Sequence, residues 1–187
     1  MMTTRTIVGF SLAAIFVASM IAIVSAQPSW LAVDSSNIAQ KGSKTYQLSI
    51  DAADTIPRNA GKGVLAGYGW FYASGPDTVF AVTTHNPVRD SRQNPDHWHV
   101  HNVVAGAPSI SDGTVDACIV SLSEYVQAGI AIKGDKMTIN VPATTLSGTL
   151  GAGAGAFEIV PTDADHCGET ILANGNPSGL HLGVKFT

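Results

Sequence analysis

The sequence lacks a run or stripe of basic residues, which argues against nucleic acid as a partner. It has no Gly-x-Ser-x-Gly, so a serine hydrolase triad is not indicated. Its Gly- and Ala-rich run at residues 148–156 lacks the lysine of a phosphate-binding loop, so we assign no nucleotide-binding role to this run. After residue 27 no convincing amphipathic helix is found, and short apolar runs alternate with Gly, Pro, Asn and Asp. These absences together favour a β-rich protein that does not bind nucleic acid.

The N-terminus has the pattern of an export signal. Arg5 precedes an unbroken apolar run over residues 7–24, and Val24-Ser25-Ala26 suits cleavage before Gln27. We predict a signal helix within residues 1–26; the alternative is a retained membrane anchor, since 18 apolar residues are near the lower limit for a span. Either reading predicts a secreted or extracytoplasmic protein, with no membrane contact for the rest of the chain unless the segment is retained.

Residues 27–187 are predicted to form one domain. Their 161 residues are enough to bury a real core, and nine basic against fourteen acidic residues give a net charge of −5. This part contains both cysteines, Cys118 and Cys167, and in an exported chain an even count favours a disulfide between them. The competing reading is a thiolate metal ligand, because Cys167 directly follows His166.

Short segments rich in strand-forming residues recur along residues 27–187. In residues 136–141, for example, Met137, Ile139 and Val141 alternate with polar side chains, which is typical of a half-buried strand. The predicted strands cover residues 45–51, 64–73, 78–84, 97–104, 117–123, 129–132, 136–141, 156–161 and 180–186. Many short strands at this spacing predict an all-β protein, an antiparallel β-sandwich that is Greek-key-like or barrel-like.

The segments between the predicted strands include three of interest. A hairpin turn is predicted at residues 133–136, and the run at 148–156 is expected to be a flexible connection or a tightly packed edge. Residues 85–96 and 163–179 are expected to be long polar loops, and long loops on a rigid sheet often carry function.

Histidines concentrate in one predicted strand. His97, His99 and His101 are half of the six histidines of the chain. Alternate side chains of a strand share a face, so the three imidazoles are expected on one side and Trp98 and Val100 on the other. A row of neutral imidazoles supplies ligands for Cu²⁺ or Zn²⁺. We therefore predict a copper or zinc site, with the metal ion as cofactor.

Strand geometry limits this site. Residues two apart are about 6.5–7 Å apart at Cα, so a neighbouring pair can share an ion, whereas His97 and His101 lie about 13 Å apart. His99 belongs to the predicted site in either pairing. His85 and His166 are expected as two further ligands. Three acids are expected near the ion, either as ligands or as acceptors for a ring N–H: Asp96, Asp163 and Asp165. His181 is expected to be exposed, on the outer face of the last strand.

The pairs His97-Trp98-His99 and His99-Val100-His101 are similar to the His-x-His copper pair on a β-strand of the copper/zinc superoxide dismutases. The resemblance covers some five residues, and the family's later histidine-rich zinc loop and its arginine-bearing segment have no counterpart here. It implies a secreted or periplasmic β-sandwich, often with one disulfide, and copper as a metal.

Three functions follow from these patterns. The first is an exported protein that binds copper or zinc for storage, delivery or redox protection. The second is a non-catalytic surface or adhesion module, whose loops meet a protein or glycan partner without a metal. The third is a metal-dependent enzyme, such as a superoxide-dismutase-like oxidoreductase. Whether the protein is an enzyme stays open at this point.

Overall fold

The computed structural model describes residues 27–61, 63–85, 98–123 and 128–187, and nearly all of its regular structure is β. Two short 3-10 helices, η1 (Ser29–Leu31) and η2 (Ala143–Thr145), are the helical elements of this part of the chain. The strands are β1 (Val33–Lys41), β2 (Thr45–Ala52), β3 (Leu65–Tyr72), β4 (Gly75–His85), β5 (His99–Gly106), β6 (Ala117–Leu122), β7 (Gly129–Lys133), β8 (Lys136–Pro142), β9 (Leu150–Pro161), β10 (Ile171–Leu172) and β11 (Leu182–Phe186).

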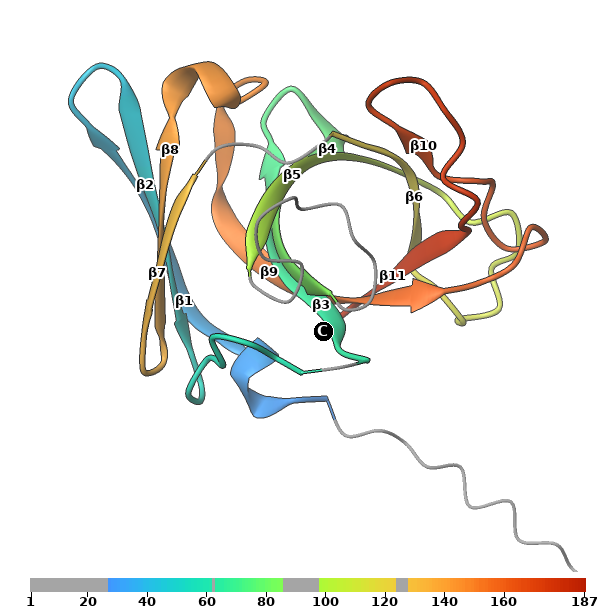
Figure 1. The fold of residues 1–187 in the computed structure, drawn as a ribbon, viewed down its shortest axis with the longest axis horizontal. Coiled ribbons are helices and arrows are strands. Elements are labelled where there is room, and N and C mark those ends of the chain that lie inside the picture. The colour runs from blue at the N-terminus through green and yellow to red at the C-terminus, as the bar shows by residue number, and fades with distance from the viewer. Residues whose placement is uncertain (1–26, 62, 86–97, 124–127) are drawn as a thin grey trace, which may run out of the picture.

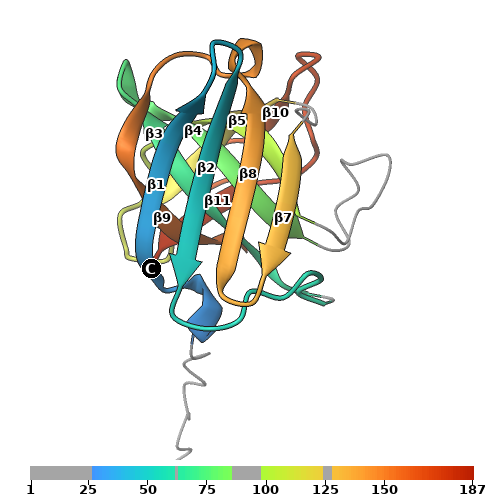
Figure 2. The same cartoon turned by 90° about the vertical axis from the view of Figure 1, so that its left-hand side faces the viewer.

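The strands form a closed barrel and a separate sheet that packs against it. The barrel order is β5-β6-β11-β9-β3-β4, closed because β4 also pairs with β5, and β10 adds to the outer side of β6. The second sheet has the order β1-β2-β8-β7. Figure 1 shows the barrel end-on with the sheet along one side, and Figure 2 shows the sheet face-on in front of the barrel. Apart from the parallel pair β10–β6, the described strand pairs are antiparallel, which confirms the predicted all-β, antiparallel fold in its barrel-like form.

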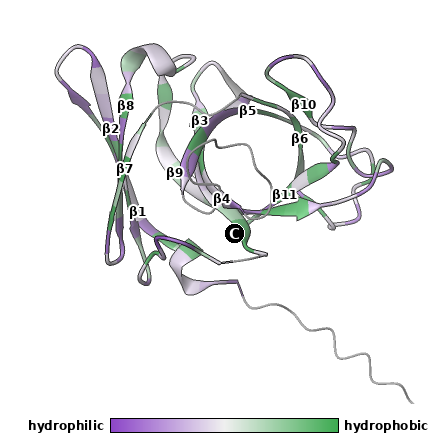
Figure 3. Ribbon diagram, viewed as in Figure 1, coloured by the Kyte–Doolittle hydropathy of each residue, from purple (hydrophilic) through white to green (hydrophobic). Residues whose placement is uncertain are grey.

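The main core lies between the sheet and the outside of the barrel. Every second residue of β2 and β8 faces this layer, as the alternation in residues 136–141 predicts. From the sheet come Leu48, Ile50, Met137, Ile139 and Val141, and from the barrel come Tyr68, Trp70, Phe80, Val82, Trp98 and Val100. Burial of each large side chain of this kind contributes roughly 1.5–3 kcal/mol, so this layer is the chief source of stability. In Figure 3 the turn between β1 and β2 is hydrophilic, away from this layer.

A second, smaller core fills part of the barrel itself. Ala81, Ile119, Phe157 and Val184 are buried inside it, from four different strands. Gly67 also faces this interior, and a Cβ there would lie 2.4 Å from the carbonyl oxygen of Val82 and 2.9 Å from the Phe157 ring. The missing side chain lets β3 and β4 pair while the phenyl ring lies across them.

Two features of the sheets differ from the sequence expectation. The run at 148–156 is not a loose connection: residues 150–156 form the first part of β9 and pair with β3 on one side, whereas β11 pairs only with residues 157–161. Ala154 and Ala156 pack on the main core and Gly155 lines the cavity of the barrel, so the strand alternates although its side chains are too small for hydropathy to reveal it. The strand β1 was not predicted, because it is a mostly polar edge strand that packs on the core through Ile38.

The predicted disulfide joins Cys118 of β6 to Cys167, and no cysteine is left as a thiolate ligand. It ties the loop at residues 163–179 to the barrel wall. The predicted turn at 133–136 is also confirmed: Lys133 pairs with Lys136, and Gly134 takes a φ of +63°, a left-handed conformation that suits glycine.

The predicted signal helix lies outside the described residues. Within the described ranges, no helix has the length and apolar character needed to cross a bilayer.

Candidate metal centre

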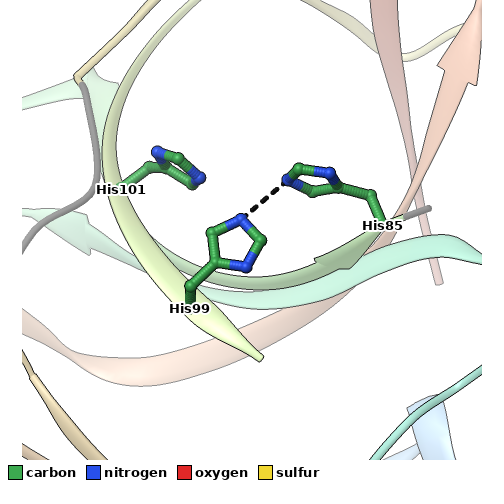
Figure 4. Close-up of side chains that lie close together, drawn as sticks. All are labelled: His85, His99 and His101. Atoms are coloured by element: carbon green, nitrogen blue, oxygen red, sulfur yellow. Dashed lines mark hydrogen bonds between the residues drawn. The ribbon is translucent and has the colours of Figure 1, made fainter. Parts of the chain in front are cut away.

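Two neighbouring barrel strands position three histidines at one end of the barrel interior. In the β4–β5 register Thr83 lies opposite His99, and Ala81 lies opposite His101. His85 ends β4 two residues beyond Thr83, so its side chain is diagonal to His99 and within reach of it. Figure 4 shows the three rings turned toward a common point inside the barrel.

The alternation that the sequence predicts is confirmed for the described part of this strand. His99 and His101 face the barrel interior, whereas Trp98 and Val100 lie in the main core on the other side. The Trp98 ring stacks on Tyr68 with centroids 5.6 Å apart, and its Nε1–H donates to the carbonyl of Pro57 at 2.7 Å. The indole therefore anchors the start of β5, which fixes the backbone that carries the histidines.

The ring nitrogens are close enough for three bonds to one ion. The Nε2 atoms of His85 and His99 share a hydrogen bond at 2.8 Å, so one of them carries a proton that a bound ion would replace. One ligand atom from each of the three rings lies within 4.8 Å of the others. Two nitrogens bound at about 2.05 Å are about 2.9 Å apart at a 90° angle, and at most about 4.1 Å apart. The His85–His99 pair fits directly, and a pair at the 4.8 Å limit would have to close by about 0.7 Å, which side-chain rotation can supply.

The hydrogen bond of His101 fixes which of its nitrogens can bind. Its Nδ1 lies 2.9 Å from the carbonyl oxygen of Ser123, which can only accept, so Nδ1 carries the proton and donates. In the neutral ring Nε2 then holds the lone pair. A backbone carbonyl in this role is the usual partner of a metal-binding histidine, because it sets the tautomer and the ring orientation.

The site is shielded from bulk solvent. His85, His99 and His101 are 6%, 2% and 3% exposed. Thr83, beside them on the same face of β4, is 4% exposed, and its hydroxyl has no hydrogen-bond partner among the described residues. A cluster of three buried imidazoles could hold a metal ion, and three protein ligands would leave a coordination position for a further molecule.

Of the other residues that the sequence singled out, His97 and Asp96 lie outside the described residues. His166 is not brought to the cluster of described histidines. Its Nδ1 donates to Asp163, on the same disulfide-linked loop, at 2.7 Å, and its Nε2 donates to Asp112, in the segment between β5 and β6, at 3.0 Å. Asp165 belongs to the same loop, where its backbone N–H donates to Asp163.

These contacts shift the ionisation of that loop. The hydrogen bond to Asp163, and then the one to Asp112, raise the pKa of His166. The pKa of Asp112 is lowered, first by the backbone N–H of Thr114 and then by His166. A neutral imidazole has one N–H, so the doubly donating ring is the imidazolium form, and the arrangement is an ion-pair network that ties the loop together.

The position of His181 differs from the exposed position that the sequence predicts. His181 is half-buried, it lines the cavity of the barrel, and its Nδ1 donates to the carbonyl of Cys167 at 2.8 Å. The residue stands just before β11, so the alternation within that strand does not govern its side chain.

The chain was compared with known protein families, curated proteins and solved structures, and none of them matches it.

Proposed function

We propose that the protein binds one copper or zinc ion through His85, His99 and His101, and that it does so outside the cytoplasm. The observation that carries the proposal is the convergence of three buried imidazoles from two paired strands. A hydrogen-bonded cluster without a role would not need three rings inside a barrel, where polar groups displace apolar contacts.

The histidine ligand set fits either metal. The 2.8 Å between the Nε2 atoms of His85 and His99 is the length of their hydrogen bond, and a bound ion would set its own spacing, about 2.9 Å for ligands at 90°. A tetrahedral zinc site would need about 3.3 Å, a change of about 0.5 Å that rotation of the two side chains can supply. Tetragonal nitrogen sites are typical of Cu²⁺, whereas zinc binds imidazole in tetrahedral sets.

Metal titration of protein stripped with a chelator tests the proposal. We expect one equivalent of Cu²⁺ or Zn²⁺ to bind by calorimetry and by elemental analysis. The electron paramagnetic resonance spectrum of the Cu²⁺ form should show coupling to nitrogen from more than one imidazole. Loss of a direct ligand should cost more than the tenfold to hundredfold typical of outer partners, so His99→Ala should weaken binding by more than about a hundredfold.

The matched control is His166→Gln, which removes a histidine outside the cluster. Its metal affinity should equal that of the wild type within about twofold. If His99→Ala retains the wild-type affinity, or if the wild type takes up no stoichiometric metal, the proposal is wrong and the surface-module reading gains support.

Export is the second part of the proposal, and it rests on the N-terminal pattern and on the Cys118–Cys167 disulfide, a bond typical of oxidising compartments. Expression in an exporting host with mass spectrometry of the product tests it. A mature N-terminus at Gln27 supports a cleaved signal, and an intact chain in the membrane fraction supports a retained anchor.

A further inference from the structure

A cavity of about 280 Å³ extends along the barrel from the histidine end. His85 and His101 line it at that end, and Phe71 and Phe186 line it at the other. These two phenylalanines are 38% and 48% exposed, and their ring centroids are 6.3 Å apart. Because they are both cavity walls and surface residues, the cavity reaches solvent beside them.

Small residues account for the cavity. A barrel of eight strands has an interior just wide enough for side chains to fill, and a six-stranded barrel is narrower, so ordinary side chains would leave no space. Here Ala81 of β4 and Ala105 of β5 take interior positions, and Gly155 of β9, which is exposed, lines the cavity where it reaches solvent. A Cβ built on Gly155 would meet no atom within 4 Å, so that position faces open space.

The walls are apolar except at the histidine end. Valine, leucine, isoleucine and phenylalanine side chains line most of the cavity, and among the described residues no acidic or basic side chain other than histidine lines it. The buried hydroxyl of Thr83 stands at the histidine end and has no partner among the described residues. Such a site favours a molecule with an apolar body and a single neutral polar group.

The volume sets the size of that molecule. An apolar cavity of about 150 Å³ binds benzene, which has six heavy atoms, so 280 Å³ suits about eleven on the same scale. A charged head group is disfavoured, because the described lining of the cavity offers no fixed opposite charge.

We propose that the barrel interior binds a small neutral organic molecule of about eleven heavy atoms, with its hydroxyl or carbonyl group at Thr83 and its apolar body directed toward Phe71 and Phe186. This binding uses the cavity and not the metal. It is tested on metal-free protein, so that it can fail or succeed independently of the proposed metal site.

Thymol is the probe, since it has eleven heavy atoms and one hydroxyl on an apolar body. Calorimetry on metal-free protein should give one binding site and a negative heat-capacity change, the mark of apolar burial. The matched probe p-cymene lacks the hydroxyl and should bind roughly twofold to tenfold more weakly, the net effect of one hydrogen bond. Retinol, with about twice as many heavy atoms as the estimated capacity, should not bind.

Variants locate the molecule. Gly155→Leu fills the cavity from its wall and should weaken thymol binding about tenfold or more. The control is Gly153→Leu, which places the same side chain on the same strand at a residue that does not line the cavity. A Cβ at Gly153 also meets no atom within 4 Å, so this variant should leave thymol binding unchanged. Thr83→Val should bring thymol and p-cymene to equal affinity.

A measurement on the wild type covers the case in which Gly155→Leu does not fold. Methyl NMR shifts on adding thymol should concentrate on Val79, Ala105 and Val184, which line the cavity, and should spare Val141 of the other core. Absence of thymol binding, or shifts outside the cavity, would overturn the proposal, as would unaltered binding to a folded Gly155→Leu protein.

Discussion

Replacing Gly67 by alanine tests how closely the barrel wall is packed next to the proposed metal centre. The added Cβ would lie 2.4 Å from the carbonyl oxygen of Val82, 2.9 Å from Cζ of Phe157 and 3.0 Å from Cγ2 of Thr83. The phenyl ring can turn, but the carbonyl oxygen belongs to the backbone of β4 and can move only if the strands separate. Overpacking of this kind costs about 1–3 kcal/mol.

The matched control is Gly153→Ala, where a Cβ meets no atom within 4 Å and φ is not positive. Alanine at such a position should raise the free energy of unfolding by about 0.4–1 kcal/mol, because it reduces the conformational entropy of the unfolded chain. Gly67→Ala should therefore unfold roughly 2–12 °C below the wild type, and Gly153→Ala at or just above it. Urea denaturation followed by tryptophan fluorescence gives the free energies of unfolding.

The same substitution should also change the affinity of the proposed site for its metal ion. Thr83, which pairs with Gly67, stands two residues before His85, so separation of the strands would move His85 away from His99. We expect Gly67→Ala to weaken metal binding, whereas Gly153→Ala should not. Equal stability of the two variants would refute the reasoning about the strand contact.

Two further predictions concern the disulfide-linked loop. Replacing Cys118 and Cys167 by serine should lower the free energy of unfolding by about 4 kcal/mol, because the bridge closes a loop of about 50 residues; chemical denaturation checks this, and a loss below about 1 kcal/mol would contradict it. For His166, the raised pKa means that its stabilising contribution is complete below the unfolded value of 6.5 and is lost as pH rises through the higher folded value. The lowered pKa values of Asp112 and Asp163 mean that their contribution is present above 3.8 and is lost as pH falls through the folded values. His166→Gln should therefore reduce the melting temperature more at pH 5.5 than at pH 8.5, and an equal reduction at both would count against the ion-pair network.

Most of what the sequence predicts about the site follows from the alternation of side chains along a β-strand. His99 and His101 share a face because they are two apart on a strand, and Trp98 and Val100 identify which face meets the core. Nothing local specifies that β5 would pair with β6 and close a barrel, and closure is what turns a row of surface imidazoles into a buried cluster. His85 could be suggested by its place at a strand end, but its approach to His99 depends on the β4–β5 register.

Other features depended on contacts between distant segments. His166 lies within a polar loop that has three nearby acids, and its partner Asp112 is 54 residues away, so the sequence could not separate an ion pair from a metal ligand. The cavity arises from glycine and alanine on several strands, and their small side chains produce no hydropathy pattern. Gly155 was thus assigned to a featureless run although it lines the cavity.

The proposed metal site and the proposed ligand cavity share His85 and His101, so we expect the two binding events to be coupled. An ion held by these imidazoles would lie at the histidine end of the cavity, near the Thr83 hydroxyl where the polar group of a ligand is expected. The ligand then meets a different polar partner in the loaded protein, and its affinity should change by about fivefold or more. By thermodynamic linkage thymol must alter metal affinity by the same factor, which titrations in both orders measure. Identical thymol affinities with and without the metal would separate the two sites and leave the barrel with two unconnected functions.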